Sequence, residues 1–130
     1  MAVTATKTVS TVVSSAANTA GSTTRGTLDL RTALGGILTF KMTNGGTGPT
    51  IQCTANVLVA HNTGTTPTAA SAGTDWKTVY TVGNGTTNSA IGEFSYTFGA
   101  EVEHLEIEFT GNTGQSVTVE AIASVVASIG

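Results

Sequence analysis

Short segments in which apolar and polar side chains alternate account for most of this chain. In the segment "GILTFKMTN" the apolar residues Leu38, Phe40 and Met42 occupy every second position. Successive side chains of an extended strand point to opposite faces, so each such segment has one apolar face to bury. The same alternation recurs in seven segments, which are 27–31, 36–44, 50–61, 75–82, 92–98, 104–109 and 116–128. An eighth strand is expected within 2–15.

Glycine, asparagine and proline gather between these segments, as in "NGGTGP" and "GNTGQ". They suit tight turns, because glycine and asparagine tolerate a positive φ and proline fixes φ. Eight strands in 130 residues, each with one buried face, predict an all-β fold, an antiparallel two-sheet sandwich of the jelly-roll type. An immunoglobulin-like sandwich is the alternative, although the Cys…Trp…Cys pattern of that fold is absent.

The strand pattern divides the chain into two regions. Residues 21–130 are expected to form a single β-sandwich domain. In 1–20 the valines and threonines define no single inward face, so this region is predicted to be an extended N-terminal arm or a first strand. An arm can add a strand to the sheet of a neighbouring subunit through main-chain hydrogen bonds. The polar loop 61–74 is the second candidate contact region, since structureless loops of ~12 residues or more tend to be functional. The interface candidates in these two regions are Val9, Val12, Val13, His61, Thr65 and Pro67.

Charged residues are scarce, at 10% of the chain, against about 25% in an average soluble protein. Threonine supplies about one residue in five. Lysine and glutamate cost side-chain entropy and desolvation when a partner covers them. A surface rich in threonine avoids these costs, so the composition favours a protein that is packed among neighbours in an assembly.

Several classes of partner and site do not fit this composition. The five basic residues are scattered along the chain and form no patch for a phosphate backbone, so nucleic-acid binding is not expected. No apolar run approaches the ~20 residues of a membrane span, and the start of the chain lacks the apolar segment of a secretory signal. Cys53 is the one cysteine, which excludes an intrachain disulfide and favours a small buried hydrophobic side chain.

The stretch "GAEVEHLEIEFTG" holds four of the eight acidic residues and one of the two histidines. If 104–109 is a strand, Leu105, Ile107 and Phe109 face the core. The alternate side chains His104, Glu106 and Glu108 are then expected to form a solvent-exposed face. These three are the candidate cation ligands, but a defined oxygen cage normally takes ligands from several loops. Neither a metal site nor a catalytic carboxylate pair is therefore expected here, and no cofactor is expected.

Trp76 follows Asp75, and an exposed tryptophan beside a carboxylate suits a stacked sugar ring. Trp76 nevertheless shares its parity with Tyr80 and Val82, so packing in the core is favoured. No Gly-x-Ser-x-Gly motif and no phosphate-binding loop occur in the sequence. The chain is not expected to be an enzyme.

Four stretches carry a resemblance to a known group of proteins. They are "TTRGTLDLRTALGGILTFKMTNGGTGPT", "ANVLVAHNTG", "DWKTVYTV" and "VEHLEIEFTGNTGQSVTVEA", and together they cover most of the chain from Thr23 onward. The chain resembles small virion proteins of tailed bacteriophages that are similar to capsid decoration (cement) proteins with jelly-roll folds. This group has no catalytic motif.

The resemblance implies a structural protein that is displayed in many copies on a phage particle. It implies a homo-oligomer, a dimer or trimer, whose partner is the major capsid protein or another virion protein. It places the protein in the virion, which assembles in the host cytoplasm. A tail component and a carbohydrate-binding, lectin-like β-sandwich module remain the alternative functions.

Overall fold

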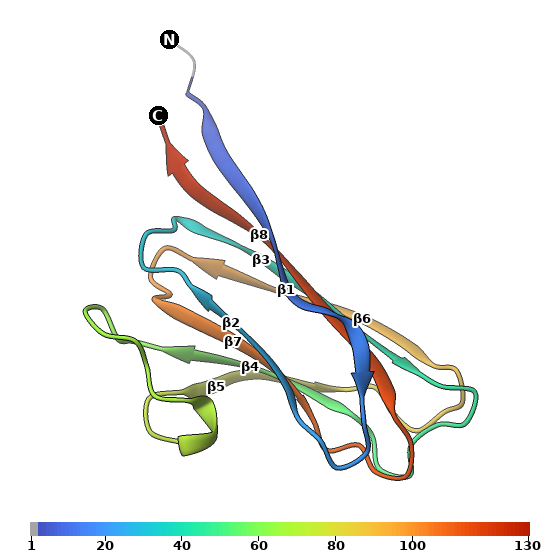
Figure 1. Ribbon diagram of the computed structural model, residues 1–130. Coiled ribbons are helices and arrows are strands. Elements are labelled where there is room, and N and C mark those ends of the chain that lie inside the picture. Colours follow the sequence, from blue (N-terminus) through green and yellow to red (C-terminus); the bar gives the residue numbers. More distant parts are fainter. Residues whose placement is uncertain (1–2) are drawn as a thin grey trace.

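The computed structural model describes residues 3–130, apart from the side chain of Ala72, and shows a sandwich of two β-sheets (Figure 1). Within these residues the chain forms eight strands, no α-helix and one short 3-10 helix, η1 (Ala70–Ala72). The strands are β1 (Ala5–Asn18), β2 (Thr24–Asp29), β3 (Gly35–Asn44), β4 (Thr54–Ala60), β5 (Lys77–Gly83), β6 (Ile91–Gly99), β7 (His104–Thr110) and β8 (Val117–Ile129). The predicted strands and the predicted all-β fold are confirmed.

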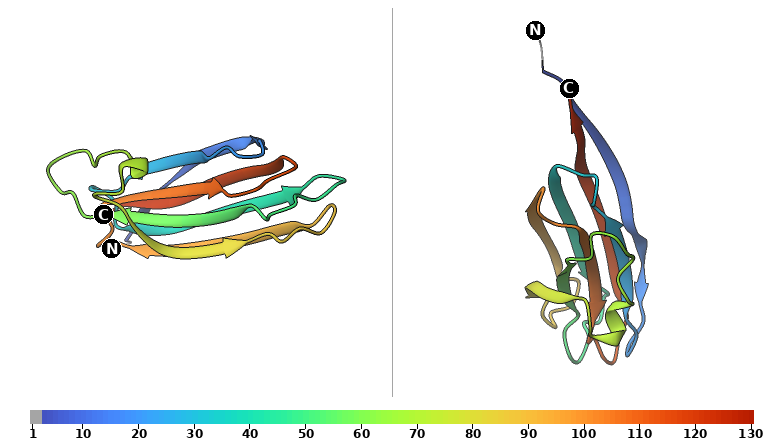
Figure 2. Two further views of the ribbon diagram at one scale, coloured as in Figure 1. Left: turned by 90° about the horizontal axis from the view of Figure 1, so that it is seen from below. Right: turned by 90° about the vertical axis from the view of Figure 1, so that its left-hand side faces the viewer.

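The two sheets each contain four antiparallel strands, in the orders β1-β8-β3-β6 and β2-β7-β4-β5. Strand β1 pairs with β8, β2 with β7, β3 with β6 and β4 with β5, so the chain behaves as one long antiparallel ribbon wrapped into two layers. This is the strand order of a jelly roll. Figure 2 shows the two layers stacked face to face.

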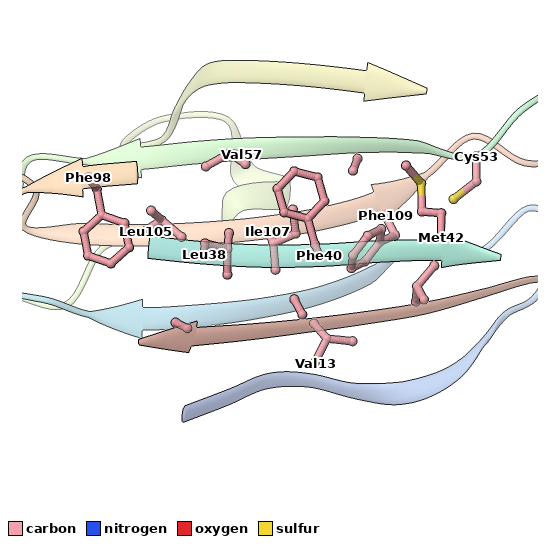
Figure 3. Close-up of a cluster of buried hydrophobic side chains, with 14 of the residues drawn as sticks. Val13, Leu38, Phe40, Met42, Cys53, Val57, Phe98, Leu105, Ile107 and Phe109 are labelled. Carbon is pink, nitrogen blue, oxygen red and sulfur yellow. The ribbon is translucent and has the colours of Figure 1, made fainter. Parts of the chain in front are cut away.

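The core lies between the inward faces of the two sheets, and Figure 3 shows its largest side chains. The alternation in β3 sends Leu38, Phe40 and Met42 into it, and β8 contributes small side chains at every second position. The β7 residues Leu105, Ile107 and Phe109 are fully buried, as their spacing predicts. The small Ala121 on β8 lies beside the large Phe40 on β3, and Phe40 packs edge to face on Phe109 of the other sheet, so the two layers interdigitate as in a protein interior.

Cys53 lies fully buried in this core just before β4. Burial raises the pKa of its thiol to about 11, because a thiolate would lose its solvation there. The prediction of a small buried hydrophobic residue is confirmed. Ile51, two residues earlier, is exposed and belongs to an isolated bridge with Thr113.

Residues 5–18 are the edge strand of the first sheet and pair with β8 from end to end. Val13 faces the core and Val12 packs against it, whereas Val9 is 72% exposed on the outer face. The pairing shifts register at three places along β1. Such bulges bend an edge strand, which explains why the valines define no single inward face.

The N-terminal end of β1 and the C-terminal end of β8 project together beyond the other strands (Figure 1). Their pairing continues past the strand ends, where Thr4 and Gly130 exchange two main-chain hydrogen bonds of 2.8 and 3.0 Å. No helix in the described part of the chain is long and apolar enough to cross a membrane.

A buried pair of amides joins the other end of β1 to the turn between β7 and β8. The side-chain nitrogen of Asn18 donates to the side-chain oxygen of Asn112 at 2.6 Å, and the side-chain nitrogen of Asn112 donates to the main-chain oxygen of Asn18 at 3.0 Å. Both residues are almost completely buried. Burial removes the two side-chain amides from water, and their mutual hydrogen bonds offset the free-energy cost of that burial.

Trp76 and Tyr80 lie on opposite faces of their sheet, which corrects the prediction that they share one. Strand β5 pairs Tyr80 with Val57 and then Thr78 with Leu58, so one residue, Val79, is left out of the register. An extra residue reverses the alternation beyond it. Tyr80 therefore contacts Phe40 in the core, while Trp76 packs in a separate cluster.

Candidate functional site

The loop between β4 and β5, residues 61–76, folds back over the outer face of the β2-β7-β4-β5 sheet. Trp76 at its end is only 7% exposed and packs against Leu58 and Ala60 of β4 and Ala70 of the loop. In Figure 1 the loop with η1 lies beside the β4–β5 pair. The sandwich thus has a small second apolar cluster on the outside of one sheet.

Asp75 and Trp76 hold the loop in shape. The Asp75 carboxylate accepts hydrogen bonds from the main-chain N–H of Thr68 at 2.9 Å, from the Thr68 hydroxyl and from the side-chain amide of Asn62. These bonds, with the Thr68 N–H contributing most, lower the pKa of Asp75. The indole nitrogen of Trp76 donates to the main-chain oxygen of Thr68 at 2.7 Å. Asp75 is therefore used for holding the loop, and the Trp76 indole is already hydrogen-bonded.

The loop buries side chains that the alternation of β7 places on the outside. His104 is 3% exposed and Glu106 is 4% exposed, so the expectation of a solvent-exposed face is wrong for both. The Nε2 atom of His104 lies 3.0 Å from the main-chain oxygen of Asn62. Glu108 lies further from the loop and stays partly exposed. A side chain at an outward position of a strand is exposed to solvent only where no other segment covers it.

Arg25 on β2 forms ion pairs with both glutamates, so one positive charge offsets part of two negative ones. Its guanidinium contacts both Glu106, at 3.0 Å, and Glu108. Burial raises the pKa of Glu106, while the hydrogen bond and charge of Arg25 and a hydrogen bond of 3.2 Å from the Thr27 hydroxyl act in the opposite direction. The two acidic side chains thus share one cation, and a carboxylate so engaged is a poor metal ligand.

The polar contacts of Arg25 and Glu108 continue across the other two strands of the sheet. The side-chain nitrogen of Asn56 on β4 donates to Glu108 at 2.8 Å, and the hydroxyl of Thr81 on β5 donates to Asn56 at 2.9 Å. Arg25, Glu108, Asn56 and Thr81 therefore form one transverse chain of contacts over all four strands. Cross-strand contacts of this kind stabilise a sheet by a few tenths to about 1 kcal/mol each.

Asp29 and Arg31 form a second charge pair at the end of β2. The Arg31 side chain donates to the Asp29 carboxylate at 3.0 and 2.7 Å, and its main-chain N–H donates at 3.1 Å. Arg31 lowers the pKa of Asp29 to about 2 by these bonds. The Nδ1 atom of His104 lies 4.0 Å from the same carboxylate.

A cavity of about 370 Å³ lies between the loop and the sheet. Its sheet side is polar and its loop side is largely apolar. The residues that line it are Thr27, Asp29, Thr66, Pro67, Thr68, Ala69, Ala70, Trp76, His104 and Glu106. No group of three or more His, Cys, Asp and Glu side chains suited to a metal ion occurs among the residues that the structure describes.

The outer face of the other sheet has a different character. It is an open face, across which β8, β3 and β6 align Ile122 with Thr39 and Ser95, and Ser124 with Ile37 and Thr97. Its exposed large apolar residues include Val9, Ile37, Ile91 and Ile122. Lys41 on β3 is aligned with Glu93 on β6 and with Glu120 on β8. Among the paired residues of these three strands, this is the one row made of charged side chains.

The six predicted interface residues do not come together. Val9 lies on the open outer face of the first sheet, and Val12 and Val13 point inward from the same strand. His61 and Thr65 are exposed in the loop on the other sheet, and Pro67 lines the cavity. Sequence reasoning did not single out Arg25, Thr27 and Asp29, although each lies at an outward position of an alternating strand.

No protein-family model matches this sequence, and no curated protein matches it significantly. Solved structures with the same fold do match. A cleaved adhesin domain of Lys-gingipain from Porphyromonas gingivalis has a TM-score of 0.58 and 11% identity over 85% of this chain and 71% of that chain. The infectious bursal disease virus VP2 subviral particle has a TM-score of 0.50 and 11% identity over 94% of this chain and 32% of that chain.

The enzymatically active domain of tailspike protein 4 from bacteriophage CBA120 also matches, with a TM-score of 0.50 and 10% identity over 92% of this chain and 19% of that chain. The chain therefore spans about a third of the VP2 chain and about a fifth of the tailspike chain. At these identities the likeness concerns the fold. This chain is a two-sheet β-sandwich of a kind that also occurs in an adhesin domain, in the VP2 subviral particle and in a phage tailspike.

Proposed function

We propose that this protein is a non-enzymatic structural component of a phage particle, which decorates and stabilises the capsid through repeated contacts with subunits. The observation that carries the proposal is the open outer face of the β1-β8-β3-β6 sheet, where β-branched apolar and hydroxyl side chains predominate. The sandwich fold, which a viral capsid protein shares, and the resemblance of the sequence to phage virion proteins support it.

The size of this face suits a specific contact. Four strands about 4.8 Å apart, each of roughly nine residues of ~3.4 Å, form a face of the order of 600 Å². Each partner in a standard interface buries ~800 Å², so the face and its rim suffice for one.

The chemistry of the face suits a contact that is repeated many times. Threonine and isoleucine lose little side-chain entropy when they are covered, and few charges lose their solvation. Each contact is weak by itself. Copies that also contact one another on a lattice gain through multivalency, and we infer that the chain forms homo-oligomers on the particle. The projecting β1–β8 ribbon supports this role, because an isolated two-stranded ribbon is at best marginally stable in water.

The experiment is a co-sedimentation assay of the purified chain with empty phage shells, with light scattering to measure the oligomeric state. Ile122→Glu places a charge in the centre of the face and is expected to weaken shell binding at least tenfold. Val79→Glu is the matched control, because Val79 is 43% exposed against 41% for Ile122 and lies on an edge strand of the other sheet.

Equal shell binding by the two variants would contradict the role of this face. A monomer that does not bind shells at all would contradict the decoration function. Binding to isolated tails instead of shells would point to a tail component, which is the alternative within the same class.

A further inference from the structure

We propose that the cavity beneath the 61–76 loop binds a neutral polyhydroxylated ligand, one pyranose residue of a glycan. The proposal concerns the outside of the β2-β7-β4-β5 sheet and does not depend on the assembly face of the other sheet. It rests on the volume of the cavity, its two chemically different walls and the ion pairs that already engage its carboxylates. With about 370 Å³ the cavity falls within the ~300–1,000 Å³ of typical ligand sites.

The two walls match the two chemical surfaces of a sugar ring. The loop side offers an apolar surface to the ring C–H groups, beside two threonines; its residues are Thr66, Pro67, Thr68, Ala69, Ala70 and Trp76. The opposite side carries two carboxylates, a histidine and a threonine hydroxyl, which are Asp29, Glu106, His104 and Thr27. Carboxylate oxygens accept hydrogen bonds from sugar hydroxyls and retain free lone pairs after binding one arginine.

The engagement of the carboxylates by arginine favours a neutral ligand over a cation. Arg31 pairs with Asp29, and Arg25 pairs with Glu106 and Glu108. A metal ion or an ammonium group would have to compete with these guanidinium groups for the same oxygens. A hydroxyl group needs only one lone pair and leaves these three ion pairs in place. Carboxylates that are held in position by arginine are also pre-oriented acceptors.

The loop side of the site is built before any ligand arrives. Asp75 accepts three hydrogen bonds from within the loop, Trp76 donates to Thr68, and His104 contacts Asn62. A ligand therefore does not have to order the loop, and the entropic cost of binding is reduced.

Trp76 is the chain's one tryptophan, so its indole N–H signal and its fluorescence report occupancy of this cavity without ambiguity. The experiment is a titration of the ¹⁵N-labelled full chain with glucose, galactose, mannose, rhamnose and N-acetylglucosamine, at up to ~20 mM so that millimolar dissociation constants are detected. At least one sugar is expected to shift the indole signal in a saturable way. Calcium chloride and methylammonium chloride are titrated in parallel and are expected to leave it unchanged.

Two variants and one control localise the binding. Glu106→Gln keeps a hydrogen-bonding side chain of the same shape, and loss of the charged acceptor is expected to weaken binding about tenfold. Ala69→Trp is made at an exposed loop position and is expected to abolish binding by filling the cavity without removing any existing contact. Glu93→Gln on the other sheet is the control and is expected to bind like the unaltered chain.

The proposal is overturned if no sugar of the panel shifts the Trp76 indole signal, if Ala69→Trp leaves the shift intact, or if the cations shift it instead. Neither Glu106→Gln nor Ala69→Trp touches the outer face of the β1-β8-β3-β6 sheet. Shell binding by Ala69→Trp is therefore expected to be normal, and the failure of one proposal can be told from the failure of the other.

Discussion

The Nε2 atom of His104 lies 3.0 Å from the main-chain oxygen of Asn62, 42 residues earlier in the chain. This contact connects the first residue of β7, an inner strand of the β2-β7-β4-β5 sheet, to the start of the loop that covers it. Trp76, at the other end of the loop, is also buried against this sheet. The two residues therefore attach both ends of the loop to the sheet.

His104→Ala is expected to lower the free energy of unfolding by about 1–3 kcal/mol, because it removes a buried hydrogen bond and leaves a void beneath the loop. Urea denaturation measures the change. His61→Ala is the matched control, since His61 is exposed, and should change the stability by less than about 0.5 kcal/mol. Hydrogen exchange of the Thr68 amide should accelerate in His104→Ala alone. Equal effects of both variants would show that the contact does not hold the loop.

The lowered pKa of Asp29 is expected to make the free energy of unfolding depend on pH in the acid range. Its pKa is about 2 in the folded state, below the ordinary 3.8, so the folded chain releases this proton more readily than the unfolded chain. The stabilising contribution is complete above pH 3.8 and is lost as the pH falls toward 2. Asp29→Asn should therefore flatten the decline of the urea midpoint between pH 4 and 2. The effect is small, because the side chain is largely exposed to solvent. A decline as steep as that of the unaltered chain would contradict the assignment.

The raised pKa of Glu106 is expected to make the free energy of unfolding depend on pH with the opposite sign. Burial raises the pKa of its carboxyl in the folded state, so the folded chain binds this proton more tightly than the unfolded chain. Its contribution to stability is present below the ordinary pKa and is lost as the pH rises through the raised value. Glu106→Gln should remove that loss, which a series of urea midpoints from pH 4 to 7 would detect. An unchanged series would show that Arg25 outweighs burial.

Asn112→Ala is expected to cost about 1–3 kcal/mol, because the buried amide of Asn18 would lose a partner at 2.6 Å. The double variant with Asn18→Ala separates this pair from other losses. A coupling energy of about 0.5–3 kcal/mol is expected for residues in direct contact. Additive effects within about 0.3 kcal/mol would mean that the two amides act independently.

Cys53 is expected to resist thiol reagents in the folded state. Its thiol is fully buried and its pKa is about 11, so little reactive thiolate is present or accessible near pH 8. Reaction with a chromogenic disulfide should proceed only as fast as the chain opens, and urea should accelerate it to the rate of a free thiol. Rapid labelling without urea would contradict the buried position.

Much of the fold could be read from local alternation. In β3 and β7 the apolar residues at every second position, such as Phe40 and Ile107, are the ones that the structure buries. Local spacing suffices there because an interior strand must bury one face whatever lies further along the chain.

The candidate site could not be read in the same way. His104 and Glu106 occupy outward positions, and only a loop from another part of the chain makes them interior. That loop is polar in sequence, and its anchor Trp76 changes sides through the extra residue at Val79. The alternation of apolar and polar residues in the sequence reveals neither the covering of a strand by a distant loop nor a register shift within a strand pair.

The hydrogen bonds between Thr4 and Gly130 bring the two ends of the described chain to the same pole of the molecule. Polypeptide added at either end would therefore emerge side by side, far from the turns at the opposite pole. A linker of a few glycines would be enough to join the ends. The chain could then be opened at another turn, and a cargo fused there would be displayed on a different side of the domain.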